Sequence, residues 1–311
     1  MEDAALSLDR VWKTYGDFTA VRDVSLSIPR GTLCSFLGPN GAGKTTTLRM
    51  ILDIIRPTRG SISVLGAPSA LQVRQRIGYL PEEKGLYKKM KVAEIIAYFA
   101  RLKGMERRAA RQRAAELLSR YGLTDFADAR VESLSKGMGQ KVQVISAVAH
   151  QPELVILDEP FSGLDPVNQQ VLETLIRDLR NNGSTVIFST HVMSHAERLC
   201  DRILLIAKGT KIFDGSLAEA RSLIPRRVIL ATGDDVSALA GDDVGHLAPV
   251  FGTGADPVWA VSLTDQATPT SVLKKCFELG INLSRFEYTE ASLHDVFVHL
   301  VGDDATEHRF R

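Results

Sequence analysis

The sequence is poor in cysteine and contains no long apolar run. Its 311 residues include only 3 cysteines, which lie far apart without metal-ligand spacing: Cys34, Cys200 and Cys276. We therefore interpret all three as small apolar core residues of a protein from a reducing compartment. No run of about 18 apolar residues occurs, and residues 1–10 lack the apolar segment of a signal peptide. These absences predict a cytoplasmic chain that neither spans a membrane nor is secreted.

A strong net charge is also lacking. The formal net charge is +1, so the chain as a whole shows no signature of a polyanion-binding protein. The charge is unevenly distributed, because residues 222–311 contain 7 Lys and Arg against 13 Asp and Glu, whereas residues 1–221 contain 31 against 24. Together with the length, this shift predicts a large basic domain followed by a small acidic one.

Glycine is concentrated in one stretch, residues 38–45, which reads Gly-Pro-Asn-Gly-Ala-Gly-Lys-Thr. It fits the phosphate-binding P-loop pattern G-x-x-x-x-G-K-[ST], and it lies between an apolar run and a helix-like segment, as that motif requires. Glycines let the backbone bend around a polyphosphate so that its N–H groups point at the anion. We expect Lys44 to reach the β and γ phosphates of ATP and the Thr45 hydroxyl to ligate Mg²⁺. The nucleotide-binding residues expected from this stretch are Gly38, Asn40, Gly41, Gly43, Lys44, Thr45 and Thr46.

The periodicity of the remaining chain up to residue 224 predicts a mixed α/β domain. Residues 6–28 alternate like two antiparallel strands, and residues 92–121 have apolar positions at helical spacing within a helical insertion of about residues 88–150. The basic cluster of this insertion, around Arg107 and Arg111, is interpreted as a solvated helix face rather than a partner-binding patch. Continuous apolar runs at 154–157 and 186–188 are typical of buried parallel strands, and the helix between them has Asp165 as N-cap and Pro166 at its first position.

Polar side chains follow three of these strands where each strand ends. Asp158 and Glu159 follow one run, His191 follows another, and the P-loop follows a third. In open α/β sheets ligands bind along the edge formed by the carboxyl ends of the strands, so these groups should converge there. Their chemistry suits ATP hydrolysis, with Asp158 for Mg²⁺, Glu159 to deprotonate or orient water, and His191 near the γ phosphate.

Pro225 marks the predicted domain boundary. We expect residues 225–302 to form a small α+β domain with strands at 227–231, 258–263 and 283–288 and helices at 270–279 and 292–301. The Gly- and Asp-rich residues 233–256 are predicted to be irregular, and residues 303–311 to be a disordered tail.

With these motifs, the sequence resembles the nucleotide-binding subunits of ABC transporters over about residues 5–220. Residues 134–138, Leu-Ser-Lys-Gly-Met, resemble the LSGGQ signature of that family, with Lys136 and Met138 as departures. Residues 162–165 match the D-loop, His191 the switch histidine and Tyr15 the aromatic residue that stacks on adenine. From the residues alone, Tyr15 is equally well a packing residue. The resemblance implies a P-loop ATPase with a mostly parallel core sheet, an antiparallel β lead-in and a helical insertion.

The Q-loop glutamine of the family corresponds to Glu82 in this chain. A carboxylate can ligate Mg²⁺ or bind its water, but it adds negative charge beside the phosphates. Glu82 is therefore either a metal ligand or a solvated charge.

The resemblance also implies partners and a mechanism. Two ATP-binding subunits, identical or paralogous, would pack head to tail, with Ser135 and Gly137 of one covering the ATP on the P-loop of the other. Closure would drive a separate membrane permease through the surface around residues 82–90 and the helical insertion, which places the chain peripherally on the inner face of the cell membrane. The Gly-Tyr-Leu-Pro-Glu-Glu run, the Leu-Ser-Lys-Gly-Met stretch and the extra domain resemble exporters such as sodium-extrusion and antibiotic or lipid exporter ATPases.

Two other functions fit parts of the sequence. A soluble ABC-type ATPase acting on ribosomes or DNA is the main alternative, but the single P-loop, the lack of sustained heptads and the acidic extra domain disfavour it, and we expect no nucleic-acid partner. P-loop kinases and GTPases lack the signature stretch. The transported substrate is not encoded, because the permease selects it.

Overall fold

The computed structural model describes residues 4–83, 85–241, 243–250, 256–264 and 266–302. The chain forms two compact units, Met1–Ser216 and Leu217–Arg311, which are described separately. The division falls after Ser216, whereas the sequence predicted it after Ile224. The reason is that helix α7 (Leu217–Ser222) packs against the last helix, α9 (Leu293–Val301), and so belongs to the second unit. The predicted tail at 303–311 lies outside the described residues.

The first unit is built on a six-stranded sheet in the order β5-β6-β7-β3-β8-β9. All neighbouring pairs are parallel except β8 and β9, which form an antiparallel hairpin. Every residue of β3, β6 and β7 is buried, which explains why their sequences are continuously apolar instead of alternating. The strands are β3 (Leu33–Leu37), β5 (Ile77–Leu80), β6 (Leu154–Asp158), β7 (Thr185–Thr190), β8 (Arg202–Ala207) and β9 (Thr210–Gly215).

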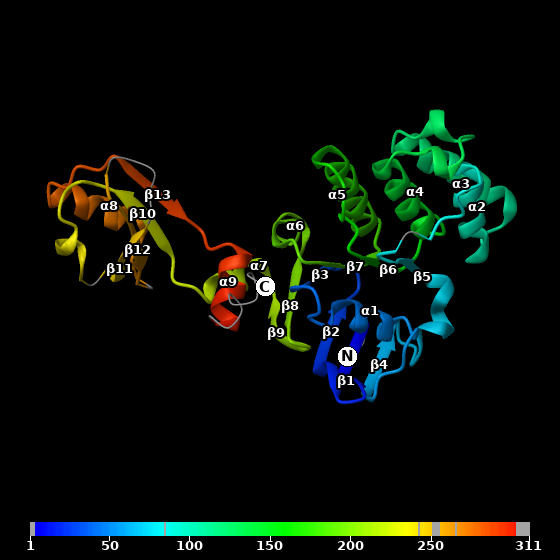
Figure 1. The fold of residues 1–311 in the computed structure, drawn as a ribbon, viewed down its shortest axis with the longest axis horizontal. Helices are drawn as coiled ribbons and strands as arrows, with labels where there is room; N and C mark the ends of the chain where they lie inside the picture. Colours follow the sequence, from blue (N-terminus) through cyan, green and yellow to red (C-terminus); the bar gives the residue numbers. More distant parts are fainter. Residues whose placement is uncertain (1–3, 84, 242, 251–255, 265, 303–311) are drawn as a thin grey trace. The chain divides into compact units, whose positions relative to one another are not determined.

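Two hydrophobic cores lie on the two faces of this sheet, and Figure 1 shows the helices and strands that cover each face. On one face, Phe36 and Ile156 pack with α1 and with an antiparallel sheet in the order β2-β1-β4. On the other face, Leu157 and Phe188 pack with the helical insertion and α5. The antiparallel lead-in and the helical insertion are both confirmed. The elements are β1 (Ala4–Tyr15), β2 (Phe18–Pro29), α1 (Lys44–Ile51), β4 (Arg59–Val64), α2 (Val92–Leu102), α3 (Arg107–Arg120), α4 (Lys136–Val148), α5 (Pro166–Asn181) and α6 (Met193–Leu199).

Local capping explains where α5 begins. The Asp165 side chain accepts a hydrogen bond from the Asn168 backbone N–H at 3.0 Å, and Pro166 occupies the first helical position, where no intrahelical donor is needed. The predicted start of this helix is confirmed. Among the described residues, no helix is long and apolar enough to cross a membrane.

The second unit contains a four-stranded antiparallel sheet in the order β11-β12-β10-β13, packed against α8. The prediction that residues 233–256 are irregular is wrong for 244–250, which form β11. Their side chains carry little apolar alternation, and the strand exists because it pairs with β12. The elements are β10 (Arg227–Ala231), β11 (Val244–Val250), β12 (Val258–Leu263), α8 (Pro269–Glu278) and β13 (Arg285–Thr289).

Candidate active site

The P-loop connects β3 to α1 and adopts a conformation that needs its glycines. Gly43 has a φ of +100°, and a Cβ there would lie 2.6 Å from the Ala20 carbonyl oxygen. Neither the left-handed backbone nor the close contact tolerates a side chain. The loop lines a cavity of about 340 Å³ together with Glu82 and Glu159. The cavity therefore combines backbone donors at a helix start with two carboxylates, a setting that suits a polyphosphate with its metal ion.

Lys44 is held inside the P-loop. Its Nζ donates to the carbonyl oxygens of Gly38 at 2.7 Å and Pro39 at 3.1 Å, and it lies 3.8 Å from Oε1 of Glu159. The side chain is buried, and burial lowers the pKa of the ammonium group, an effect that the nearby carboxylates, led by Glu159, oppose. An anionic ligand would compensate the buried cation more fully than the carbonyl groups do.

Asp158 and Thr45 meet across the ends of β6 and the P-loop. The Thr45 hydroxyl donates to Oδ1 of Asp158 at 3.2 Å, and the Ser189 hydroxyl, at the end of β7, lies 2.5 Å from the same oxygen. Two oxygen ligands of the kind that Mg²⁺ prefers thus lie side by side. The hydrogen bond from Ser189 orients the Asp158 carboxylate. These residues fit the predicted metal site, because phosphate oxygens and water can complete an octahedral shell.

Glu159 and His191 form the second pair at this edge. His191 Nδ1 lies 3.1 Å from both carboxylate oxygens of Glu159. Since a carboxylate only accepts hydrogen bonds, Nδ1 carries the proton in this contact. Glu159 has a φ of +47°, an unfavourable conformation for a side chain of this size, and the Ser189 hydroxyl accepts a hydrogen bond from its backbone N–H at 3.1 Å. The predicted convergence of Lys44, Thr45, Asp158, Glu159 and His191 is therefore observed.

The aromatic side chain at the P-loop cavity is Phe18 and not Tyr15, which the family resemblance had indicated as the residue that stacks on adenine. Phe18 is 64% exposed and lines the P-loop cavity, whereas Tyr15 is not among the described residues that line it. The Tyr15 ring instead lies 4.9 Å from Nζ of Lys13. Phe18 was missed because no motif marks it, and its place at the cavity depends on the pairing of β2 with β1.

The signature stretch lies away from the P-loop cavity. Ser135 caps α4 by accepting from the Met138 N–H at 3.3 Å, and a Cβ at Gly137 would clash with the Asn168 side chain at 2.4 Å. Ser135 and Gly137 are not among the described residues that line the cavity, so within one chain they do not meet Lys44. A second missed residue, Gln140, connects this helix to the active site, because its buried Nε2 donates to the Pro160 carbonyl oxygen at 3.1 Å.

Comparison with known proteins decides the family. Residues 21–162 match the sequence family described as ABC transporter. The chain is 44% identical over 298 residues to the "Uncharacterized ABC transporter ATP-binding protein YhaQ" of Bacillus subtilis (strain 168), which covers 96% of this chain and 98% of the relative. The chain is an ATP-binding subunit of the ABC transporter family.

Two further relatives extend this result. The Nod factor export ATP-binding protein I of Burkholderia orbicola (strain AU 1054) is 37% identical over 306 residues, covering 97% of this chain and 98% of the relative. A dimeric ATP-binding cassette in a post-hydrolysis state, bound to ADP and phosphate, superposes with a TM-score of 0.63 at 28% identity over 68% of this chain and 98% of that one. This ABC subunit is accordingly an ATPase with the family's P-loop fold. Subunits of this family work with membrane permease components.

Proposed function

We propose that this ATPase drives export through a separate membrane permease and works as a pair of ATP-binding subunits. The observation that carries the proposal is the meeting of Lys44, Thr45, Asp158, Glu159 and His191 at one sheet edge. The names of full-length relatives support export, because the Nod factor protein is an export ATPase. They favour transport over action on ribosomes or DNA.

In this proposal the side chains divide the work of hydrolysis. Lys44 and the P-loop N–H groups would hold the β and γ phosphates. Thr45 and Asp158 would hold Mg²⁺, which supplies positive charge beside the phosphates. Glu159 takes a proton from the attacking water. His191 holds the carboxylate of Glu159 in place through Nδ1. Glu82, in the same cavity, is placed to bind Mg²⁺ or one of its waters.

The location of the signature supports head-to-tail pairing. In a single chain the N-terminus of α4, with Ser135 and Gly137, does not line the P-loop cavity. A second subunit in head-to-tail orientation would bring its own α4 N-terminus to the phosphates, where N–H donors and the positive end of the helix stabilise negative charge. The aromatic residue for the base would be Tyr15 or Phe18, both of which are exposed.

An aromatic cluster marks the surface we assign to the permease. Tyr87 contacts Tyr98 and Phe99 of α2, with ring centroids 5.8 and 6.5 Å away, and Tyr87 is 55% exposed. Exposed, rigid aromatic side chains are common anchors at protein interfaces. Tyr87 follows Glu82 by only a few residues, and Glu82 lines the P-loop cavity, so changes at the phosphates would reach this cluster through a short stretch of chain.

Co-expression with the permease tests the proposal. A membrane protein with about six apolar spans, encoded beside this chain, is the natural candidate. We expect it to co-purify with the wild-type ATPase and to stimulate its ATP hydrolysis, and we expect Tyr87→Ser to weaken co-purification while the variant still binds ATP. Co-purification with ribosomes or DNA instead of the membrane protein would contradict the proposal.

A further inference from the structure

Strand β13 forms a free edge of the second unit's sheet. It pairs with β10 on one side, and among the described residues no strand pairs with its other side. Four of its five residues are exposed. Such an edge presents unpaired N–H and C=O groups to any strand that can align with it. The opposite edge strand, β11, is less able to pair with another strand, because it contains Pro249, which lacks the N–H that a new partner strand would need.

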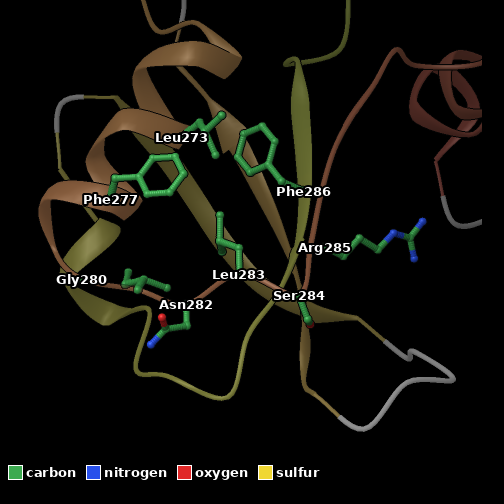
Figure 2. A pocket seen from close by; sticks show the side chains of 9 residues that line it. Leu273, Phe277, Gly280, Asn282, Leu283, Ser284, Arg285 and Phe286 are labelled. Atoms are coloured by element: carbon green, nitrogen blue, oxygen red, sulfur yellow. The ribbon is translucent and has the colours of Figure 1, made fainter.

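A pocket of about 420 Å³ with both apolar and polar lining residues adjoins this edge (Figure 2). Phe286 of β13 points toward Leu273 and Phe277 of α8, and Leu283 lies below these three side chains in the view, whereas Arg285 points away from them. Phe277 is 72% exposed. A phenylalanine this exposed beside a free strand edge is typical of a surface that another protein covers.

The charged side chains of β13 are complementary to the same strand in another copy. Arg285 and Glu287 lie two residues apart on the face opposite Phe286, and within one chain they form an ion pair with each other. If two β13 strands align antiparallel about Phe286, each Arg285 lies opposite the Glu287 of the other copy and the two Phe286 residues face each other. Opposite charges directly across an antiparallel pair are stabilising, and like charges are destabilising.

We propose that β13 pairs edge to edge with β13 of a second copy of this chain, in the antiparallel register centred on Phe286. The two sheets become one continuous sheet, and the two-fold axis brings both pockets together so that the Phe277 rings are covered from the other copy. This isologous contact is closed, because each copy uses the same surface once. The inference adds a second contact to the two-subunit assembly of the proposed function, on which it rests for its role in transport.

Charge reversal tests both the partner and the register. Arg285→Glu places two glutamates opposite each other at both cross-strand positions, and Glu287→Arg places two arginines there. The double variant Arg285→Glu/Glu287→Arg restores both opposite pairs. Sedimentation equilibrium of the full chain without nucleotide and with EDTA isolates this contact from ATP-driven closure. A matched control is Lys274→Glu, which reverses an exposed charge on α8 at a side chain 77% exposed.

We expect wild type and the double variant to self-associate, and each single variant to dissociate about tenfold more easily or more. An equimolar mixture of the two single variants should associate as tightly as wild type, because each supplies the other's opposite charge. Three results would overturn the proposal. The wild type could stay monomeric at all concentrations, or the single variants could associate like wild type. The third is a loss of association in the single variants that neither the double variant nor the mixture restores. ATP hydrolysis measured on the same samples separates this outcome from a failure of the proposed function, since none of these residues lies in the ATPase unit.

Discussion

Gln140 and Pro160 are joined by a buried hydrogen bond of 3.1 Å from the Gln140 amide to the Pro160 carbonyl oxygen. The contact connects the helix that begins at the signature with the turn that carries Glu159. The same turn contains Phe161, on which His195 stacks with a centroid distance of 4.1 Å. Because Glu159 has a strained φ of +47°, the turn depends on such contacts to keep its conformation. A displacement of the signature helix would therefore reach Glu159, the carboxylate that we propose as the catalytic base of the same chain.

Replacing Gln140 tests this connection. Gln140→Leu keeps the volume but leaves the buried Pro160 carbonyl without this donor, which costs about 1–3 kcal/mol of stability. We expect kcat for ATP hydrolysis to fall several-fold while the KM for ATP stays near the wild-type value, because the P-loop is not touched. Steady-state kinetics measure both constants, with Gln112→Leu on α3, an exposed position that pairs with Glu116, as the control. An unchanged kcat would show that the turn keeps its conformation without the hydrogen bond from Gln140.

Replacing Lys44 tests the phosphate site. Lys44→Ala removes the buried cation beside Gly38 and Glu159, and a charge-assisted contact of this kind contributes about 1.5–3 kcal/mol. We expect most ATP affinity and turnover to be lost, as measured by a filter-binding assay and phosphate release. Lys274→Ala in the second unit is the control for loss of a lysine. Near-normal ATP binding by Lys44→Ala would contradict the P-loop assignment.

The amide variant of Glu159 separates binding from hydrolysis. Glu159→Gln keeps the size of the side chain but cannot take a proton from water, so we expect ATP binding with very slow turnover. Since ATP would bridge two subunits, the variant should accumulate as an ATP-bound dimer, which light scattering after size exclusion with Mg-ATP and then Mg-ADP can detect. Glu82→Gln, in the same cavity, is the matched comparison. If Glu159→Gln hydrolyses ATP at the wild-type rate and Glu82→Gln does not, Glu82 is the catalytic carboxylate.

His150 gives the ATPase unit a predictable sensitivity to acid. Burial and, to a lesser extent, the positive charge of Lys103 lower the pKa of His150 to about 4, and the contact with the Ile77 carbonyl opposes this shift only in part. Between its ordinary pKa of about 6.5 and pH 4, the unfolded state binds more protons than the folded state, so stability falls as the pH drops. We expect a contribution of about 2–3 kcal/mol to be lost across this window. His150→Gln should unfold with a weaker pH dependence in urea titrations between pH 7 and about 4, and an identical dependence would exclude His150 as the cause.

Truncation tests the boundary between the two units. A chain that ends at Ser216 keeps the whole ATPase unit, so we expect it to be soluble and to bind ATP. A chain that ends at Ile224 keeps α7 without α9, which exposes Ala220 and Ile224, both buried in the intact chain. We expect the longer fragment to be the less soluble, as judged by the soluble fraction and by binding of a fluorescent ATP analogue. Loss of ATP binding in a folded 1–216 fragment would show that the second unit supports the site.

The sequence by itself determined the elements whose signals are local. The P-loop glycines, the apolar runs of β3, β6 and β7, and the capping of α5 by Asp165 each follow from spacing within a few residues, and each is found in the structure. Because parallel strands present their carboxyl ends at one edge, the meeting of the P-loop with Asp158, Glu159 and His191 could also be anticipated.

Only the tertiary structure decided which side chains touch at that edge. Ser189 reaches Asp158 and the Glu159 backbone because β7 lies between β6 and β3, and local sequence does not determine that strand order. Gln140 meets Pro160 through the packing of α4 on the sheet, and Phe18 enters the cavity through the pairing of β2 with β1. Strand β11 likewise exists through its pairing with β12 rather than through its own pattern. Contacts between residues far apart in the chain depend on global packing, which propensity and periodicity do not encode.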